Sequence, residues 1–445
     1  MTLATEPQQP PEPAGRRWGR WGLFGHIDFR KLWIGDTISQ FGTQVSQLAI
    51  PYIATVLIGA SAFEVALLGT IEFLPFLLLT LPAGAWVDQL RRRPILISGD
   101  VLRAAALVSI PVAWELSVLT IWQLYVVGFV TGLGTVFFDV AYQSYLPSLV
   151  EREDLVEGNG KLEATRASAQ VVGPGLAGGL ISVLSAPLAI LGDCLSYVLS
   201  ALFVWRIRKP EPHPEEARIA AGVAREPLRR QVAEGLRFVL GNPYLRGIAG
   251  ATSSSNLFGN VAFGVLPVYL YRELGLSAAT VGVIFGLASI GSLVGALVAN
   301  RLAAWFGLGR TIIGTIFIGG VAALLVPFAP PAFPEAFLVT AFFFQGFGAV
   351  AYNINQVSFR QAICPTSMQG RMNATMRFLV WGTIPIGSVL GGIVASVIGV
   401  HGAILVGAVG SCFPFLSVLL SPVRTLRTMP AQVEDQGQPQ AAAAG

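Results

Sequence analysis

Charged residues are scarce in this sequence. Only 12% of the 445 residues are Asp, Glu, Lys or Arg, whereas soluble domains carry roughly 25%. Hydrophobic residues make up 53% of the chain, and there are 50 glycines in addition. Because so few charges cannot cover a water-exposed surface, the composition predicts an integral membrane protein and excludes a soluble globular domain.

Other features are also missing. The three cysteines and three histidines are scattered along the chain, which indicates neither a disulfide framework nor a zinc site. No G-x-x-x-x-G-K-[ST] phosphate loop and no G-x-S-x-G nucleophile motif occurs. We therefore predict a protein without metal, without cofactor, without its own ATPase and without enzymatic activity.

Long, continuous apolar runs fill most of the chain, and they differ from the alternating pattern of membrane β-strands. They predict an all-α integral membrane protein with twelve transmembrane helices in two six-helix halves. The predicted spans are 32–57, 64–86, 95–114, 121–146, 164–184, 187–205, 247–271, 278–300, 311–329, 335–357, 374–398 and 402–421.

Polar segments divide the chain around these runs. The predicted divisions are an N-terminal tail (1–31), an N-terminal six-helix bundle (32–205), a central linker (206–246), a C-terminal six-helix bundle (247–421) and a C-terminal tail (422–445). The N-terminal tail lacks the short apolar core of a signal peptide. The basic residues of the linker are expected to meet anionic lipid headgroups rather than nucleic acid.

The positive charges predict the orientation. Nearly all of the 29 lysines and arginines lie in the tails, the linker and the loops on one side, and only Arg272 lies on the other. The positive-inside rule makes the richer side cytoplasmic, with both termini inside. The preference for arginine over lysine, with abundant Ala, Gly and Pro, is typical of GC-rich bacterial genomes, so we expect a bacterial plasma membrane.

The two halves repeat a pattern weakly. An arginine is followed by a proline eight residues later in the fifth and the eleventh span, at Arg166 and Pro174 and again at Arg377 and Pro385. Repeated halves with a substrate site between them are a common transporter plan.

The loop between the second and third spans carries an acid one turn before a basic cluster. Its residues are Gly84, Asp88, Arg91, Arg92 and Arg93. A carboxylate at a helix N-terminus or beside an arginine is stabilised by roughly 0.3–1 kcal/mol, and breaking that contact would open an inner gate. The alternative is a simple topology anchor.

This loop resembles the signature loop of the major facilitator superfamily, although Gln89 and Arg91 depart from the family pattern. The segments LWIGDTISQFG, LPAGAWVDQLRRR, GDVLRA, FFDVAYQSYLPSLV and GNGKLEATR resemble the branch that contains enterobactin-type and macrolide-type efflux proteins. The resemblance implies a proton-coupled exporter. The arginine that other drug/proton antiporters carry in the fourth helix has no counterpart in LYVVGFVTGLG, unless Arg103 substitutes for it.

The fifth span contains a glycine-rich stretch around a proline. Proline bends a helix, and small residues let a neighbouring helix approach closely. The stretch resembles the antiporter motif of the family, which favours export over uptake; ordinary close packing is the alternative. The motif residues are Gly173, Pro174, Gly178 and Gly179.

Among the few ionisable residues within the spans, Glu72 lies nearly at mid-membrane with little opposite charge nearby in sequence. Such a carboxyl must face protein or water, and desolvation favours its neutral form. We therefore predict Glu72 as the leading proton-coupling or substrate-contact residue, with Asp193 and Asp36 as weaker candidates. A buried acid of structural value is the alternative.

A second group of charges lies within about two turns of the cytoplasmic ends of the spans. Asp100 and Arg103 are three residues apart and so share one helical face. We predict a charged inner-gate network, with separate local pairs as the alternative. The predicted inner-gate residues are Gly84, Asp88, Arg91, Arg92, Arg93, Asp100, Arg103, Asp139, Arg166 and Arg377, with Asp36 beside them.

Scattered amides in apolar spans are expected to line a cavity for amphipathic organic compounds, because sugars need denser hydrogen bonding. The predicted cavity residues are Gln40, Gln44, Gln47, Asn256, Asn260, Gln345, Asn353 and Asn355. The predicted function is thus a monomeric, proton-coupled exporter of small amphipathic molecules, with membrane lipid, substrate and protons as its partners. The alternatives are a proton-coupled importer and, further away, an intramembrane enzyme or flippase.

Overall fold

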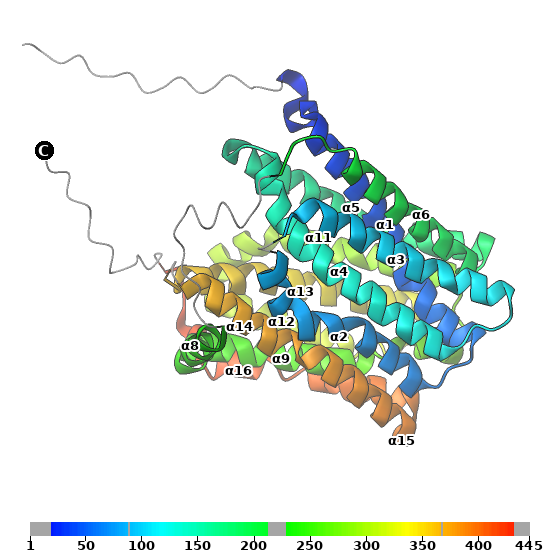
Figure 1. Ribbon diagram of the computed structural model, residues 1–445. Coiled ribbons are helices and arrows are strands. Elements are labelled where there is room, and N and C mark those ends of the chain that lie inside the picture. Colours follow the sequence, from blue (N-terminus) through cyan, green and yellow to red (C-terminus); the bar gives the residue numbers. More distant parts are fainter. Residues whose placement is uncertain (1–18, 88–89, 212–227, 366–367, 431–445) are drawn as a thin grey trace, which may run out of the picture.

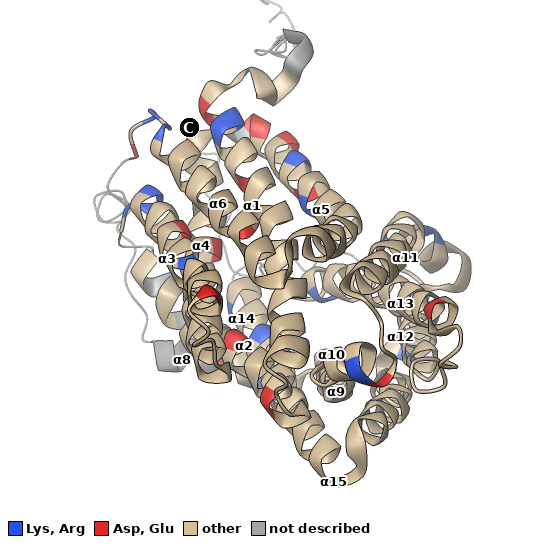
Figure 2. Ribbon diagram, turned by 90° about the vertical axis from the view of Figure 1, so that its right-hand side faces the viewer, with Lys and Arg blue, Asp and Glu red and all other residues tan. Residues whose placement is uncertain are grey.

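The computed structural model describes residues 19–87, 90–211, 228–365 and 368–430, and within them all regular structure is helical (Figure 1). Few charges interrupt the helices, so most of the ribbon in Figure 2 is uncharged. Eight of the described segments are long and apolar enough to cross a membrane by length and composition. Because no water is available inside a bilayer, helices that satisfy their own backbone groups are what such a sequence must form.

The first half contains six long helices. They are α1 (Ile27–Tyr52, continued by the π-helical η2, Ile53–Leu57), α2 (Ala62–Val87), α3 (Arg92–Glu115), α4 (Ile121–Leu149), α5 (Leu155–Leu184) and α6 (Ala186–Trp205). Short 3-10 turns precede α1 and α5, at η1 (Gly19–Gly25) and η3 (Arg152–Asp154).

The second half repeats this plan with more interruptions. Its elements are α8 (Leu228–Gly241), α9 (Pro243–Phe263, continued by α10, Leu266–Val268, and the π-helical η4, Tyr269–Glu273), α11 (Ala278–Phe306), α12 (Leu308–Ala323), α13 (Pro334–Ala362), α14 (Gln369–Trp381), α15 (Thr383–Ser411), α16 (Phe415–Leu419) and η6 (Pro422–Thr425). Both halves therefore end their first long helix in a π-helical turn.

The last two spans meet at Gly399 in α15. Its φ of 84° and ψ of 166° are non-helical, and they divide α15 into two helices that the chain connects without a loop. Glycine accepts this positive φ without the steric cost of a side chain. With this division the described helices form twelve spans in two groups of six, as predicted, α8 lying outside both groups.

Two features differ from the sequence-based expectation. The fifth span was expected from residue 164, but α5 begins at Leu155, so Arg166 lies roughly three turns inside the helix. The linker was expected to be simply polar, but its second part forms the amphipathic helix α8, which packs on α14. In both places the additional helical residues lie outside the apolar runs, so the runs alone did not predict them.

The halves close against each other at one end only. We call the end where Arg91, Arg92 and Arg93 lie the basic end, and the other the opposite end. Buried residues near the opposite end form one apolar cluster from both halves. Near the basic end the buried residues form two separate clusters, one within each half. The pairs α2–α15 and α5–α11 carry most of the contact between halves.

Candidate functional site

A cavity of about 740 Å³ lies in the second half. It is lined by α9, α12, α13 and α14, and its lining on α13 extends from Gln345 near mid-helix to Gln361 at the basic end. The cavity therefore runs from the middle of the bundle toward the end at which the halves are separate. Its volume falls within the roughly 300–1,000 Å³ of small-molecule sites.

Three of the predicted cavity amides line it, namely Asn256, Gln345 and Asn353. The Nδ2 atom of Asn256 donates to the carbonyl oxygen of Val380 at 3.1 Å. The Oδ1 atom of Asn353 accepts from the Nε2 atom of Gln356 at 2.8 Å. The Nε2 atom of Gln345 is buried and has no hydrogen-bond partner within the described structure.

The other two predicted amides of this half are placed elsewhere. Asn355 is 2% exposed and donates to the carbonyl oxygens of Ala299 and Ala351, so it joins α13 to α11. Asn260 donates to the carbonyl oxygen of Asn256 on its own helix at 2.8 Å. Neither is among the residues that line the cavity.

Sequence reasoning missed several lining residues, above all Arg360 and Trp381. Arg360 was counted as a loop charge, although it lies seven residues after Asn353 on the same helix. That spacing is two turns, so the two side chains share a face, and this could have placed Arg360 in the cavity. Trp381 lies at the end of α14, where the apolar pattern was read as an ordinary span.

A smaller cavity of about 220 Å³ lies where the halves meet. Phe76 and Thr80 of α2 face Arg377 and Trp381 of α14 across it. The ring of Trp381 lies 6.3 Å from that of Phe76 and 6.0 Å from that of Phe73. Arg377 and Trp381 line both cavities, so the two spaces adjoin at these residues.

Glu72 is on the cavity side of α2. It is four residues before Phe76 and eight before Thr80, so the three share one face of the helix, and the last two line the smaller cavity. The Glu72 side chain is exposed rather than enclosed by its neighbours. Among the described residues, no cation lies within ion-pair distance of its carboxylate.

α4 approaches Glu72 closely through glycine. A Cβ atom at Gly132 would lie only 2.2 Å from the carbonyl oxygen of Glu72, a distance that no side chain can occupy. Glycine at this position thus lets α2 and α4 pack backbone to backbone and holds Glu72 in place at mid-helix.

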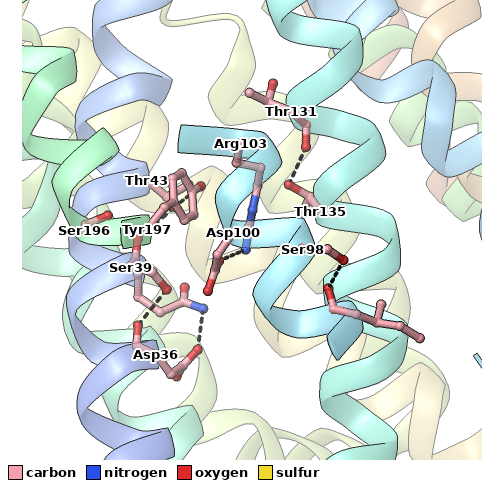
Figure 3. Close-up of polar contacts among 12 residues, drawn as sticks. Asp36, Ser39, Thr43, Ser98, Asp100, Arg103, Thr131, Thr135, Ser196 and Tyr197 are labelled. Atoms are coloured by element: carbon pink, nitrogen blue, oxygen red, sulfur yellow. Dashed lines mark hydrogen bonds and ion pairs between the residues drawn. The ribbon is translucent and has the colours of Figure 1, made fainter. Parts of the chain in front are cut away.

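Asp100 and Arg103 of α3 form a buried ion pair (Figure 3). The Arg103 guanidinium lies between two rings, 4.4 Å from the centroid of Phe138 and 4.1 Å from that of Tyr197. Both charged residues are at most 5% exposed. The pair is therefore enclosed within the first half by α4 and α6, where each charge is compensated locally.

Asp193 and Asp36 are also enclosed in the first half. Asp193 is fully buried and accepts hydrogen bonds from the hydroxyls of Ser46 and Ser196, which ties α6 to α1. Asp36 is 5% exposed and accepts from the Nε2 atom of Gln40 at 3.3 Å. Of the amides on α1, Gln44 is half-buried and Gln47 is exposed.

Three further predicted gate residues are exposed, namely Asp139, Arg166 and Arg377. Both arginines, together with Arg103, act electrostatically on the Asp139 carboxylate, although neither exposed arginine is within ion-pair distance of it in the described structure. The guanidinium of Arg377 lies 5.4 Å from the ring centroid of Trp381. Charges from both halves thus face one another where the halves are apart.

The arginine cluster between α2 and α3 is bound within the first half. The backbone N–H groups of Arg92 and Arg93 donate to the Glu211 carboxylate at 2.8 and 3.1 Å. The Arg93 side chain donates to the carbonyl oxygens of Val204 and Trp205 at the end of α6. Sequence reasoning did not identify Glu211, which stabilises the N-terminus of α3 from the linker.

The remaining residues of this loop motif are placed as follows. Arg91 is exposed and precedes α3, Gly84 lies within α2, and Asp88 lies outside the described residues.

The glycine-rich stretch of α5 packs against α11 of the other half. A Cβ atom at Gly178 would lie 2.5 Å from the carbonyl oxygen of Ala278, and one at Gly282 would lie 2.3 Å from that of Pro174. A Cβ atom at Gly179 would meet nothing within 4 Å, and one at Gly173 would meet Gln44 of α1. Gly178 and Gly282 therefore allow the close helix approach that small residues predict, and the helix that approaches belongs to the other half.

Arg272 and a pair of tyrosines also join the halves at the opposite end. The Arg272 side chain donates to the carbonyl oxygen of Thr55, with its Nε atom at 2.9 Å. The rings of Tyr52 and Tyr271 meet edge to face with centroids 5.0 Å apart. Arg272, the one cation that the sequence placed on the non-cytoplasmic side, thus binds the π-helical turn at the end of α1 across the interface between the halves.

Two six-helix halves, sealed against each other at one end, with a cavity in the second half that reaches toward the other end, define a multi-pass membrane transporter rather than an enzyme. The chain belongs to the Major Facilitator Superfamily, whose model matches residues 32–382 and 248–442. These matches confirm the resemblance seen in the sequence.

The similar proteins are efflux proteins and other transporters. The multidrug efflux pump Tap of Mycolicibacterium fortuitum is 27% identical over 82% of this chain and 88% of that protein. Macrolide efflux protein A of Streptococcus pyogenes is 23% identical over 90% of this chain and 97% of that protein. The inward-facing crystal structure of a bacterial homologue of the iron transporter ferroportin superposes with a TM-score of 0.69 at 19% identity, over 88% of this chain and 98% of that one. The last similarity supports the fold alone.

Proposed function

We propose that this protein exports small amphipathic organic compounds, such as drugs or secondary metabolites, in exchange for protons. The observation that carries the proposal is the asymmetric closure of the bundle, which is sealed at the opposite end while a cavity of about 740 Å³ reaches toward the basic end. Such a cavity exposes its contents to one side at a time when the halves rock, which is alternating access. The two efflux relatives favour export over uptake.

The basic end is assigned to the cytoplasm of a bacterium, and both chain termini with it. This assignment rests on the positive-inside rule. The described conformation is then the inward-open one, ready to load substrate from the cytoplasm or the inner leaflet. The two halves are taken as residues 32–205 and 247–421, joined by a cytoplasmic linker at 206–246 and flanked by tails at 1–31 and 422–445, and one chain suffices for transport.

Glu72 is the leading proton carrier in this proposal. It shares the helix face of Phe76 and Thr80, which line the smaller cavity. It has no cation as a fixed partner in the described structure, so its charge can change without breaking an ion pair. Asp193 differs because two hydroxyls hold it in the closed interior of the first half. Asp36 is intermediate, since Gln40 binds it and Asp139 and Arg166 influence it electrostatically.

Closure of the inner gate would bring the exposed charges of both halves together. Arg377 comes from the second half, and Asp139 and Arg166 come from the first. The buried Asp100–Arg103 pair would stay inside the first half and hold α3 against α4 and α6. Gly84, Asp88 and the arginines at 91–93 would complete the gate, and the antiporter-like stretch of α5 would form the tight contact at the opposite end.

Expression in an efflux-deficient bacterium tests this function. A panel of amphipathic compounds is measured for growth protection and for cellular accumulation, with and without a protonophore. We expect protection against some compounds, and we expect the protonophore to abolish it. Protection that survives collapse of the proton gradient would contradict antiport, and increased accumulation would indicate an importer.

A further inference from the structure

The larger cavity is positively charged and carries no compensating acid on its wall. Arg360 and Arg377 line it, and no aspartate or glutamate is among the described residues that do. The sequence of the second bundle contains only two acids, Glu273 and Glu335. Both lie near the opposite end of their helices, far from the two arginines.

Among the described residues, Arg360 has no acidic partner. Its side chain forms no ion pair within the described structure, and its Nε atom is buried without a hydrogen-bond partner. An unpaired guanidinium in such a place is costly, and a bound anion removes that cost.

Arg377 is only partly compensated. It acts across the gap on the Asp139 carboxylate, which it shares with Arg103 and Arg166. The Arg377 guanidinium lies 5.4 Å from the ring centroid of Trp381, and a contact of this kind does not use the N–H donors of the guanidinium for hydrogen bonds. Arginine in this position can bind a carboxylate, sulfonate or phosphate with two parallel hydrogen bonds.

An aromatic surface adjoins this charge. Trp381 lines both cavities and contacts Phe73 and Phe76 of the other half. A ligand whose anionic group meets Arg360 and Arg377 would place an apolar ring system against these side chains. Both halves would then contact one molecule, which is what coupling of binding to closure requires.

We propose that the cavity selects amphipathic anions, in which a carboxylate or similar acidic group is bound by Arg360 and Arg377 and an aromatic portion packs against Trp381. This inference rests on the proposed transport function, because it names the chemical class of the exported compound. Anionic lipid headgroups carry the same chemistry, so the test must separate them from a soluble substrate.

A matched pair of probes tests the charge requirement. The purified full-length protein in phosphatidylcholine nanodiscs is titrated by calorimetry with 1-naphthaleneacetate and with its neutral analogue 1-naphthaleneacetamide. We expect the acid to bind at least about tenfold more tightly than the amide, a preference of roughly 1.4 kcal/mol. Equal binding of the two probes would overturn the proposal.

The variants assign the preference to the cavity. Arg360→Gln and Arg377→Gln should each weaken binding of the acid and leave binding of the amide unchanged, whereas Trp381→Leu should weaken both probes alike. Arg360→Lys should keep part of the preference, which separates loss of charge from loss of folding. Arg301→Gln removes one positive charge from an exposed site on α11 outside the cavity and should bind like the unaltered protein.

Nanodiscs that contain phosphatidylglycerol separate the two sources of the anion. We expect 1-naphthaleneacetate to bind there almost as tightly. If this lipid abolishes binding to the unaltered protein, the site belongs to a headgroup and the substrate assignment is overturned. Because binding is measured without transport, failure of export in cells would contradict the proposed function while leaving this result standing.

Discussion

The two halves share a fold but divide their charges. The spans of the first half contain Glu72, Asp36, Asp100, Asp139 and Asp193, whereas the second half has no acid in the middle of its helices. The second half instead has two arginines that line a cavity. In a repeated architecture, such a difference supports the proposed division of labour, in which the first half would carry protons and the second would bind the substrate.

The halves also differ in how their charges are paired. In the first half Asp100 and Arg103 neutralise each other, and the rings of Phe138 and Tyr197 enclose the arginine. This pair can therefore stabilise the fold without taking part in transport. In the part of the chain that the structure describes, Arg360 of the second half has no such partner. The lesson is that a charge within a span predicts function only when its neighbours leave it uncompensated.

The largest expected effect comes from breaking the buried pair. Arg103→Met leaves the Asp100 carboxylate enclosed without its counter-charge, which typically costs about 3–5 kcal/mol of unfolding free energy. Unfolding in detergent should show this loss. The double variant with Asp100→Asn should be clearly more stable than the sum of the single effects predicts.

Strict additivity in that cycle would show that the two charges do not depend on each other. The first half would then hold uncompensated charges as the second half does, and the contrast between the halves would fail. Glu163→Gln, at an exposed site on α5, is the control for loss of one charge.

The next effect concerns the contact between the halves. Gly178→Ala places a methyl group against the backbone of Ala278, and overpacking of this kind costs typically 1–3 kcal/mol. Gly179→Ala should be neutral or slightly stabilising, since its methyl group meets nothing. Thermal unfolding of the two neighbours measures the difference, and equal effects would argue against glycine-mediated packing of α5 on α11.

A smaller effect is expected from the seal at the opposite end. Arg272→Gln replaces a charge-assisted bond to the Thr55 carbonyl oxygen with at most a neutral one, a loss of about 1–1.5 kcal/mol. The protein should then open more often on that side. A cysteine introduced at Thr55, which is fully buried, should react roughly tenfold faster with a membrane-impermeant thiol reagent when the native cysteines are absent.

Arg301→Gln is the matched control for that labelling experiment and should not change the rate. If Arg272→Gln leaves the rate unchanged as well, the side chain does not hold the halves together. The sealed end would then depend on apolar packing alone.

The smallest effect concerns a contact that holds the basic end of the first half. Asp28 precedes the first predicted span. Burial raises the pKa of its carboxyl. Hydrogen bonds from the Lys31 side chain and from the backbone of Arg208 and Lys209 outweigh this effect, so the pKa of Asp28 is lower than its ordinary value. Because the folded-state pKa is depressed, the contribution to stability is present above the unfolded value near 4 and is lost as the pH falls below it.

Asp28→Asn should therefore lower the melting temperature slightly at pH 7. The difference should shrink as the pH falls below about 4 and vanish once the carboxyl is protonated in the folded protein as well. The measurement is thermal unfolding across this pH range. A difference that persists in acid would show that the contact does not depend on an ionised carboxylate.

Much of this architecture could be predicted from the sequence. The apolar runs predicted twelve spans, since a bilayer allows few other solutions. The position of Glu72 within the second run placed this acid near mid-membrane. The glycines of the fifth span predicted a close helix contact. Their partner, α11 of the other half, could not be predicted, because pairing between halves depends on packing far apart in sequence.

The charged wall of the cavity was harder to predict. Arg360 resembles a topology anchor in the sequence, and only the length of α13 places it beside the cavity. Glu211 and α8 were missed for a related reason. Polar residues near helix ends have no apolar periodicity, so their partners become apparent only once the helices are assembled.

The division of labour is tested most directly in proteoliposomes that contain the purified protein and a compound identified in the cellular panel. With an imposed pH gradient, the unaltered protein and Glu163→Gln should accumulate the compound. Glu72→Gln should still exchange it across the membrane without a gradient, yet gain no accumulation from the gradient. If Glu72→Gln accumulates the compound as the unaltered protein does, Glu72 does not carry the proton and the account is contradicted.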